Sequence, residues 1–154
     1  MKQWYEENPK LLEGEKMAMN KFFPDFKLEK LDDGCLYWIG ELSPGIYETK
    51  FGVKKTYIVM VAYNNNHPEL EMGSSVRIYP ILPDVHDLID ECGFRPYRFL
   101  VDSSDDLLLC DNGCFSRSIY TACDALNFAQ TWFADLEMVL IGELTESDFN
   151  SKFR

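Results

Sequence analysis

The sequence lacks the runs and charges on which membrane and nucleic-acid-binding proteins depend. Its longest apolar runs, such as 57–62, are far shorter than the roughly 20 residues that cross a bilayer. Residues 1–9 contain no apolar core like that of a secretory signal peptide. Lysine and arginine number 15 against 26 acidic residues, so the formal net charge is −11. This sign repels nucleic-acid phosphates and anionic lipid headgroups. We therefore expect a cytoplasmic protein that binds neither nucleic acid nor membranes.

The motifs of metal, phosphate and serine chemistry are also missing. No Cys-x-x-Cys pair occurs among the five cysteines, and the chain has two histidines, His67 and His86. We therefore expect no structural zinc site, because such sites use closely spaced cysteine and histidine ligands. We expect both histidines to be surface or loop residues. Glycines never cluster into a phosphate-binding loop, and no serine lies in a Gly-x-Ser-x-Gly turn. The sequence therefore predicts no metal and no cofactor. An odd number of scattered cysteines is typical of a reducing compartment.

The residues that are present predict one packed domain over 1–154. Hydrophobic residues make up 46% of the chain and aromatic residues 14%, which is typical of a globular core and not of a disordered segment. A length of 154 residues is within the usual size of a single domain. The excess of acidic residues suits a basic protein partner, although such an excess is also common in proteins where it only keeps the protein in solution.

Local patterns predict a mixed α+β fold. A first helix begins after Asn8, with Pro9 in its first turn, and ends before Pro24. Its side chains at helical spacing are Leu11, Leu12, Glu15, Met19 and Phe22. Alternating segments separated by turn residues predict a four-stranded antiparallel meander, with strands Phe26–Leu31, Cys35–Leu42, Lys54–Tyr63 and Ser75–Tyr79.

The segment after the meander has weaker patterns. Pro80 is expected to end the fourth strand, and residues 85–92 to form one or two helical turns. The clearest element is a long C-terminal helix over Ala122–Ile141, which begins with the capping pattern Thr121-x-x-Asp124 and stops at Gly142. The order of elements is typical of an α+β domain.

Cys110 is the candidate for chemistry because of its setting. The apolar run 107–109 ends at this cysteine, and the polar turn Asp111-Asn112-Gly113 follows. This pattern predicts a thiol at the rim of the core, where neighbouring backbone N–H groups support a thiolate or an oxyanion. Two other interpretations stay open: a buried cysteine that packs as a small hydrophobe, and a redox pair with Cys114. Cys35 and Cys123 fall on strand and helix patterns and are expected in the core.

Taken together, the elements from about Phe22 to Leu144 resemble the ubiquitin-conjugating family, and within it the divergent bacterial branch. The resemblance is carried by Phe23-Pro24-x-Phe26, by Gly34-x-Leu36-x-Trp38-x-Gly40-x-Leu42, by Tyr57-x-Val59-x-Val61-x-Tyr63 with Pro68 and Val76-Arg77-Ile78, by Leu107-Leu108-Leu109-Cys110, and by Ala129-x-x-Trp132, Glu137 and Gly142-Glu143-Leu144. It implies the ubiquitin-conjugating (UBC) fold. It also implies that Cys110 carries an acyl group as a thioester and passes it to an amine.

The resemblance further implies a place in antiphage defence. Members of this branch occur in cyclic-oligonucleotide antiphage signalling (CBASS) operons beside a cyclic-nucleotide synthase (CD-NTase), whose C-terminus becomes joined to a target amine. The implied partners are this protein substrate and an activating enzyme.

The chain departs from the family pattern near the cysteine. Arg95-Pro96-Tyr97 lies where eukaryotic members have His-Pro-Asn, and Asp111 follows the cysteine in place of leucine. The oxyanion donor is therefore open, with Asn112 as a candidate, and Asp111 is a candidate for orienting the incoming amine. These departures keep a second hypothesis open: a catalytically inactive protein-interaction module of the same fold.

Overall fold

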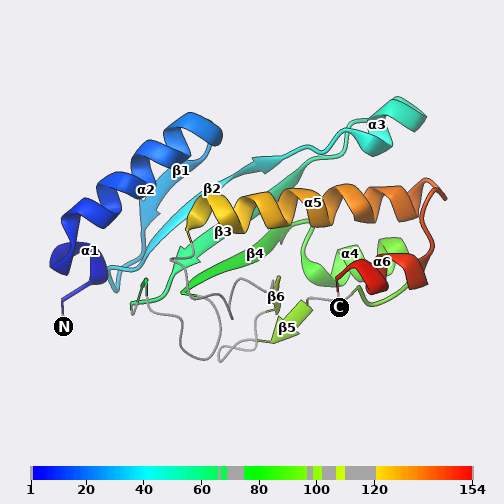
Figure 1. Cartoon of the computed structure of the whole chain (residues 1–154). Helices are drawn as coiled ribbons and strands as arrows, with labels where there is room; N and C mark the ends of the chain where they lie inside the picture. Colours follow the sequence, from blue (N-terminus) through cyan, green and yellow to red (C-terminus); the bar gives the residue numbers. More distant parts are fainter. Residues whose placement is uncertain are drawn as a thin grey trace.

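The computed structural model describes residues 2–65, 67–68, 75–96, 99–101, 107–109 and 121–153. The elements are α1 (Trp4–Glu7), α2 (Pro9–Phe22), β1 (Lys27–Lys30), β2 (Leu36–Leu42), α3 (Ile46–Phe51), β3 (Tyr57–Tyr63), β4 (Val76–Leu82), α4 (Val85–Cys92), β5 (Phe99–Val101), β6 (Leu107–Leu109), α5 (Ala122–Leu140) and α6 (Glu146–Lys152). The predicted mixed α+β fold, with a helix before the sheet and a long helix after it, is confirmed (Figure 1).

The four-stranded antiparallel meander is also confirmed, as part of a larger sheet. Strands β1 to β4 pair in sequence order, and the described residues add β6 and then β5 beyond β4, giving the order β1-β2-β3-β4-β6-β5. Every pairing is antiparallel. In β3 the odd-numbered side chains are buried and the even-numbered ones half-buried, because successive side chains of a strand point to opposite faces.

One face of the sheet is covered by helices. Figure 1 shows α5 running across the meander, with α2 beside the first strands. Helix α5 contacts β3, β4 and the helices α2, α3, α4 and α6. Its fully buried side chains include Leu126, Ala129, Trp132 and Phe133. Leu126, Ala129, Phe133 and Leu136, which follow one another at gaps of three and four residues, therefore form a face of α5 that packs into the core.

The helix boundaries follow the local signals closely. The Asn8 side chain accepts a hydrogen bond from the Leu11 N–H at the start of α2. Thr121 and Asp124 form the predicted capping box, in which each side chain accepts from the other residue's backbone N–H. Helix α5 ends at Leu140, one residue before the predicted end, and Gly142 follows with a positive φ of 82°.

The expectation that Pro80 ends the fourth strand is wrong. Strand β4 continues through Pro80 to Leu82, and the register with β3 shifts between Ile58 and Val59, next to the position opposite Pro80. Proline is tolerated inside a sheet at such an irregularity because its missing N–H is not needed in the ladder there.

A glycine in β2 is required by close packing. A Cβ built on Gly40 would lie 2.7 Å from the ring of Phe26, closer than side-chain carbon atoms approach. Phe26 is buried at the entrance to β1 and lies over β2 at this position. The absence of a side chain at Gly40 therefore leaves room for the Phe26 ring against β2.

Candidate functional site

The predicted nucleophile lies outside the described residues. Cys110, Asp111, Asn112 and Cys114 all fall within 110–120, so the structure does not test their roles. What the structure describes is the chain on both sides of this segment. Strand β6 ends at Leu109, which pairs with Ile78 of β4 and with Phe99 of β5. The chain is described again from Thr121, the N-cap of α5.

The stretch Arg95-Pro96-Tyr97, which the sequence resemblance compares with His-Pro-Asn, is described in part. Arg95 is exposed and Pro96 is buried, while Tyr97 lies outside the described residues. His86, on α4, is exposed, as expected for a surface residue. Because Tyr97 and residues 110–120 lie outside the described residues, the structure assigns no oxyanion donor.

The described residues contain a different polar site, in the core between α2, α5 and the end of β3. We define the buried polar cluster as Glu15, Trp38, Tyr63, His67 and Ser75. Glu15 is 3% exposed, His67 4% and Ser75 0%. His67 lies in a turn, as expected of a surface or loop residue, but it is buried and not at the surface. Its ring packs against the rings of Trp4 and Tyr63, which cover it from solvent.

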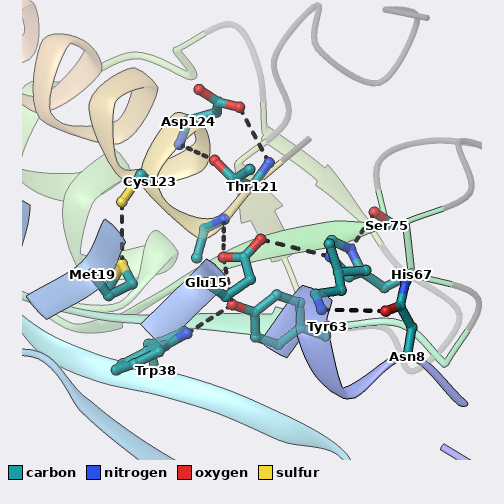
Figure 2. Close-up of polar contacts among 12 residues, drawn as sticks. Asn8, Glu15, Met19, Trp38, Tyr63, His67, Ser75, Thr121, Cys123 and Asp124 are labelled. Atoms are coloured by element: carbon teal, nitrogen blue, oxygen red, sulfur yellow. Dashed lines mark hydrogen bonds and ion pairs between the residues drawn. The ribbon is translucent and has the colours of Figure 1, made fainter. Parts of the chain in front are cut away.

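Glu15 is at the centre of the cluster (Figure 2). Its Oε2 atom accepts a 2.9 Å hydrogen bond from the Tyr63 hydroxyl and a 3.1 Å bond from the N–H of Ala122, the first residue of α5. The Tyr63 oxygen in turn accepts from the Trp38 indole at 2.8 Å. A carboxylate is stabilised at this place because the N-terminus of a helix carries a partial positive charge.

His67 connects the same carboxylate to Ser75. Its Nδ1 atom lies 2.8 Å from Ser75 Oγ, and its Nε2 atom lies 3.6 Å from Glu15 Oε1. Among the residues that the structure describes, neither Nε2 nor Oε1 has a hydrogen-bond partner within normal distance. Such atoms are costly in a core, since an unpaired buried polar group loses its hydration without compensation.

The electrostatics of the cluster affect the groups around it. Burial, followed by the negative charge of Glu15, raises the pKa of the Tyr63 hydroxyl far above its usual range. Burial also raises the pKa of Cys123 to about 11, and the charge of Glu15 contributes to that shift. Both groups are therefore neutral at physiological pH.

A hydroxyl, an imidazole and a carboxylate in one chain of contacts are the components of a nucleophilic relay. Here they lack two requirements of one. Ser75 is completely buried, so an acyl substrate has no access to its oxygen. The serine also contacts Nδ1 and the carboxylate faces Nε2, the reverse of the usual relay. The cluster is therefore a structural network in the described fold, not an active site.

The three described cysteines are poor nucleophiles. Cys123 is buried as predicted, with its sulfur 3.6 Å from the Met19 sulfur. Cys35, which was expected in the core, is half-buried, as is Cys92. Burial is the largest cause of a raised pKa at each of the three thiols, which lowers the fraction of reactive thiolate.

Sequence patterns pointed only partly to the buried polar cluster. Glu15 occupies a position of α2 at which the helical spacing predicts an apolar, core-facing residue. A glutamate at such a position indicates a buried carboxylate with hydrogen-bond partners. His67 carried no such signal, because its burial depends on Trp4 and on the strand ends. Within the described ranges, no group of three or more metal-ligating side chains occurs, and no helix has the length and apolar character needed to cross a membrane.

Comparison of the chain with protein families, with curated proteins and with solved structures finds no match.

Proposed function

We propose that this chain is a bacterial ubiquitin-conjugating-like transferase in which Cys110 carries an acyl group as a thioester. The observation that carries the proposal is the order of helices and strands along the chain, in which Cys110 follows β6 and precedes α5. A helix precedes a four-stranded antiparallel meander, the chain then passes from β6 into Cys110, and α5 follows and crosses the meander. This order supports the UBC fold implied by the sequence resemblance.

The proposed chemistry is two acyl transfers. In the first, the Cys110 thiolate attacks the carbonyl carbon of an activated protein C-terminus, so that a carbon–sulfur bond forms and the activating group departs. In the second, a neutral amine attacks the thioester carbonyl, a carbon–nitrogen bond forms, and the thiolate leaves while the amine proton passes to a base. Thiolates are good leaving groups, so the protein contributes mainly positioning and support for the oxyanion.

The partners belong to the same proposal. The acyl donor is the C-terminus of a cyclic-nucleotide synthase in antiphage defence, supplied through an activating enzyme in the cytoplasm. Asn112 is the proposed oxyanion donor and Asp111 the proposed group that orients the amine. Support comes from the sequence resemblance and from an acidic chain of net charge −11, which suits a basic partner surface.

The test is the mass of the intact protein after incubation with the synthase, the activating enzyme and ATP. We expect an adduct that excess thiol removes from the wild type. Cys110→Ser should give a thiol-resistant ester or no adduct. Cys114→Ser is the matched control, because it removes a thiol four positions away and should leave the adduct intact.

The second candidate is a catalytically inactive interaction module, favoured by Arg95-Pro96-Tyr97 in place of the family triplet. It predicts binding to the synthase without any adduct, and equal biological activity of wild type and Cys110→Ser. A redox pair instead predicts a reversible loss of about two mass units between Cys110 and Cys114 on oxidation. The three outcomes differ in mass and in thiol sensitivity, so one set of samples separates them.

A further inference from the structure

Exposed apolar side chains gather at the end of the sheet next to α3. The described residues include seven large apolar side chains that are exposed, and four of them belong to this end: Phe51, Val53, Ile81 and Leu82. Phe51 is the last residue of α3, and Leu82 is the last of β4. Leu82 pairs with Ile58 near the start of β3, which places the end of β4 beside the chain that leaves α3. Figure 1 shows α3 at the far end of the meander from α1. Such a concentration of exposed apolar groups is typical of an interaction surface.

The same place is a basic segment in an acidic chain. Residues 50–55 contain three of the 15 lysine and arginine residues and none of the 26 acidic residues. Two of the three, Lys50 and Lys54, are exposed and lie on either side of Phe51 and Val53 along the chain. The segment therefore presents positive charge and apolar surface together, which fits a ligand that has carboxylates beside apolar groups.

The fold holds this segment in place before any ligand binds. The Tyr47 N–H donates a 2.9 Å hydrogen bond to the buried Glu137 of α5. The centroid of the Phe51 ring lies 4.8 Å from that of the Tyr47 ring. Lys55, the third lysine, forms an ion pair with Glu91 of α4, and its Nζ lies 4.9 Å from the centroid of the Tyr47 ring. A surface that is already ordered loses little conformational entropy on binding.

An open cavity of about 670 Å³ adjoins this segment. Its lining includes Ile39 of β2 and Ile58 of β3, which are half-buried. Two lysines and two carboxylate side chains also belong to the lining, and they are Lys27, Lys54, Asp25 and Glu41. Because apolar residues are present and the charges balance, the cavity suits an uncharged apolar side chain.

We propose that this end of the sheet binds an acidic segment of a partner protein. We define the α3 surface as Lys50, Phe51, Val53, Lys54 and Leu82 with the cavity beside them. An apolar side chain of the partner enters the cavity, and neighbouring carboxylates pair with Lys50 and Lys54. The inference goes beyond the proposed function and does not depend on Cys110.

Net charge favours a protein segment over two other occupants of the α3 surface. Two exposed lysines attract an anionic bilayer only weakly, whereas the chain as a whole has a net charge of −11 and is repelled by it. Two copies of the chain repel each other for the same reason. A short acidic segment reaches the two lysines without bringing a large negative charge against the rest of the chain.

The experiment selects ligands for the whole chain from a display library of random peptides of about twelve residues. We expect the selected peptides to be enriched in aspartate, glutamate and large apolar residues. Their affinity, measured by fluorescence anisotropy, should fall as the salt concentration rises, because salt screens exposed charges. Selected peptides without an excess of acidic residues, or affinities that do not change with salt, would overturn the proposal.

Two matched variants test whether these peptides bind the α3 surface. Lys50→Glu/Phe51→Ser changes a lysine and an exposed phenylalanine at the end of α3. Lys21→Glu/Phe22→Ser makes the same changes at the end of α2, where the phenylalanine is also exposed. We expect the α3 variant to weaken binding by about tenfold or more and the α2 variant to leave it unchanged. Equal losses in the two variants would show that the peptides respond to total charge and not to this surface.

A single substitution covers the case in which the α3 variant does not fold. Lys54→Glu changes an exposed side chain and should also weaken binding, and circular dichroism checks its fold. When a selected peptide is added to the isotopically labelled chain, we expect the largest NMR shift changes at residues 50–58 and at Leu82. Shift changes centred elsewhere, tighter binding to phosphatidylserine vesicles than to the peptides, or a dimer that Lys54→Glu dissociates would each contradict the proposal.

Discussion

The hydroxyl of Tyr57 donates a 2.8 Å hydrogen bond to Oε2 of Glu137, inside the core between β3 and α5. Glu137 is fully buried, and its other oxygen accepts from the Tyr47 N–H at 2.9 Å. One carboxylate of α5 thus attaches both a central strand and the short helix α3. The negative charge has a structural role here, and burial together with Glu137 raises the pKa of Tyr57 far above its usual range.

Removal of the Tyr57 hydroxyl should therefore destabilise the domain. In Tyr57→Phe the ring stays, but Glu137 Oε2 loses its donor within the core, which we expect to cost about 1–3 kcal/mol. Tyr5→Phe is the control, because the Tyr5 hydroxyl donates to the neutral carbonyl of Gly34 at a half-buried site. We expect about 0.5–1.5 kcal/mol there. Urea unfolding measures both, and an equal loss in the two variants would argue against a special role for Glu137.

Truncation of Phe133 should have a larger effect. Its ring is fully buried, stacks on Tyr57 with ring centroids 4.3 Å apart, and meets Trp132 edge-on. Phe133→Ala should lower the free energy of unfolding by about 3–5 kcal/mol, as large aromatic truncations in cores do. Phe22→Ala removes the same group from a site that is 61% exposed and should change stability by less than about 0.5 kcal/mol. A near-neutral result for Phe133→Ala would show that α5 packs by another face.

Two glycine-to-alanine variants should shift stability in opposite directions. Gly40→Ala places a carbon against the Phe26 ring, so we expect a loss of about 1–3 kcal/mol. Gly14→Ala lies within α2, where the new Cβ meets no atom of the described residues within 4 Å. It should add about 0.5–1 kcal/mol because alanine favours helix over glycine. Thermal unfolding of the two variants checks the signs. A neutral Gly40→Ala would mean that Phe26 does not lie over β2.

The thiols should differ in their rates of alkylation under native conditions. Cys123, with a pKa of about 11, has only about one part in a thousand as thiolate at pH 8, and Cys35 and Cys92 also have raised pKa values. If Cys110 is an acyl carrier, it should react with iodoacetamide before these three. Peptide mass spectrometry over a time course measures the order. Labelling of Cys110 no faster than Cys123 would count against a carrier thiol.

Local signals in the sequence were sufficient for several elements. The cap at Asn8, the capping box of Thr121 and Asp124, and the spacing along α5 each depend on residues a few positions apart. Alternation within each segment predicted the meander, because the period of a strand is a local property. The predicted helical turns at 85–92 also form, as α4.

Other features depend on contacts that no local pattern encodes. Helices α1, α3 and α6 have four, six and seven residues, too few for a clear period, and were not predicted. Helix α3 lies between Gly45 and Gly52, both with positive φ, and is attached through Glu137, which is 90 positions from Tyr47. The continuation of β4 through Pro80 likewise required the register shift opposite it.

The two sites discussed above also differ in whether the sequence or the tertiary structure revealed them. Cys110 was selected from sequence alone, from an apolar run that enters a polar turn, and its role stays a prediction. The Glu15–His67 pair became visible only in the tertiary structure. Glu15 alone is a glutamate on a helix, but folding brings it to Tyr63, 48 positions away, and to Ala122, 107 positions away. Charge and burial are set by such distant neighbours, so the sequence determined the elements of this protein and the tertiary packing determined which of its polar groups are buried.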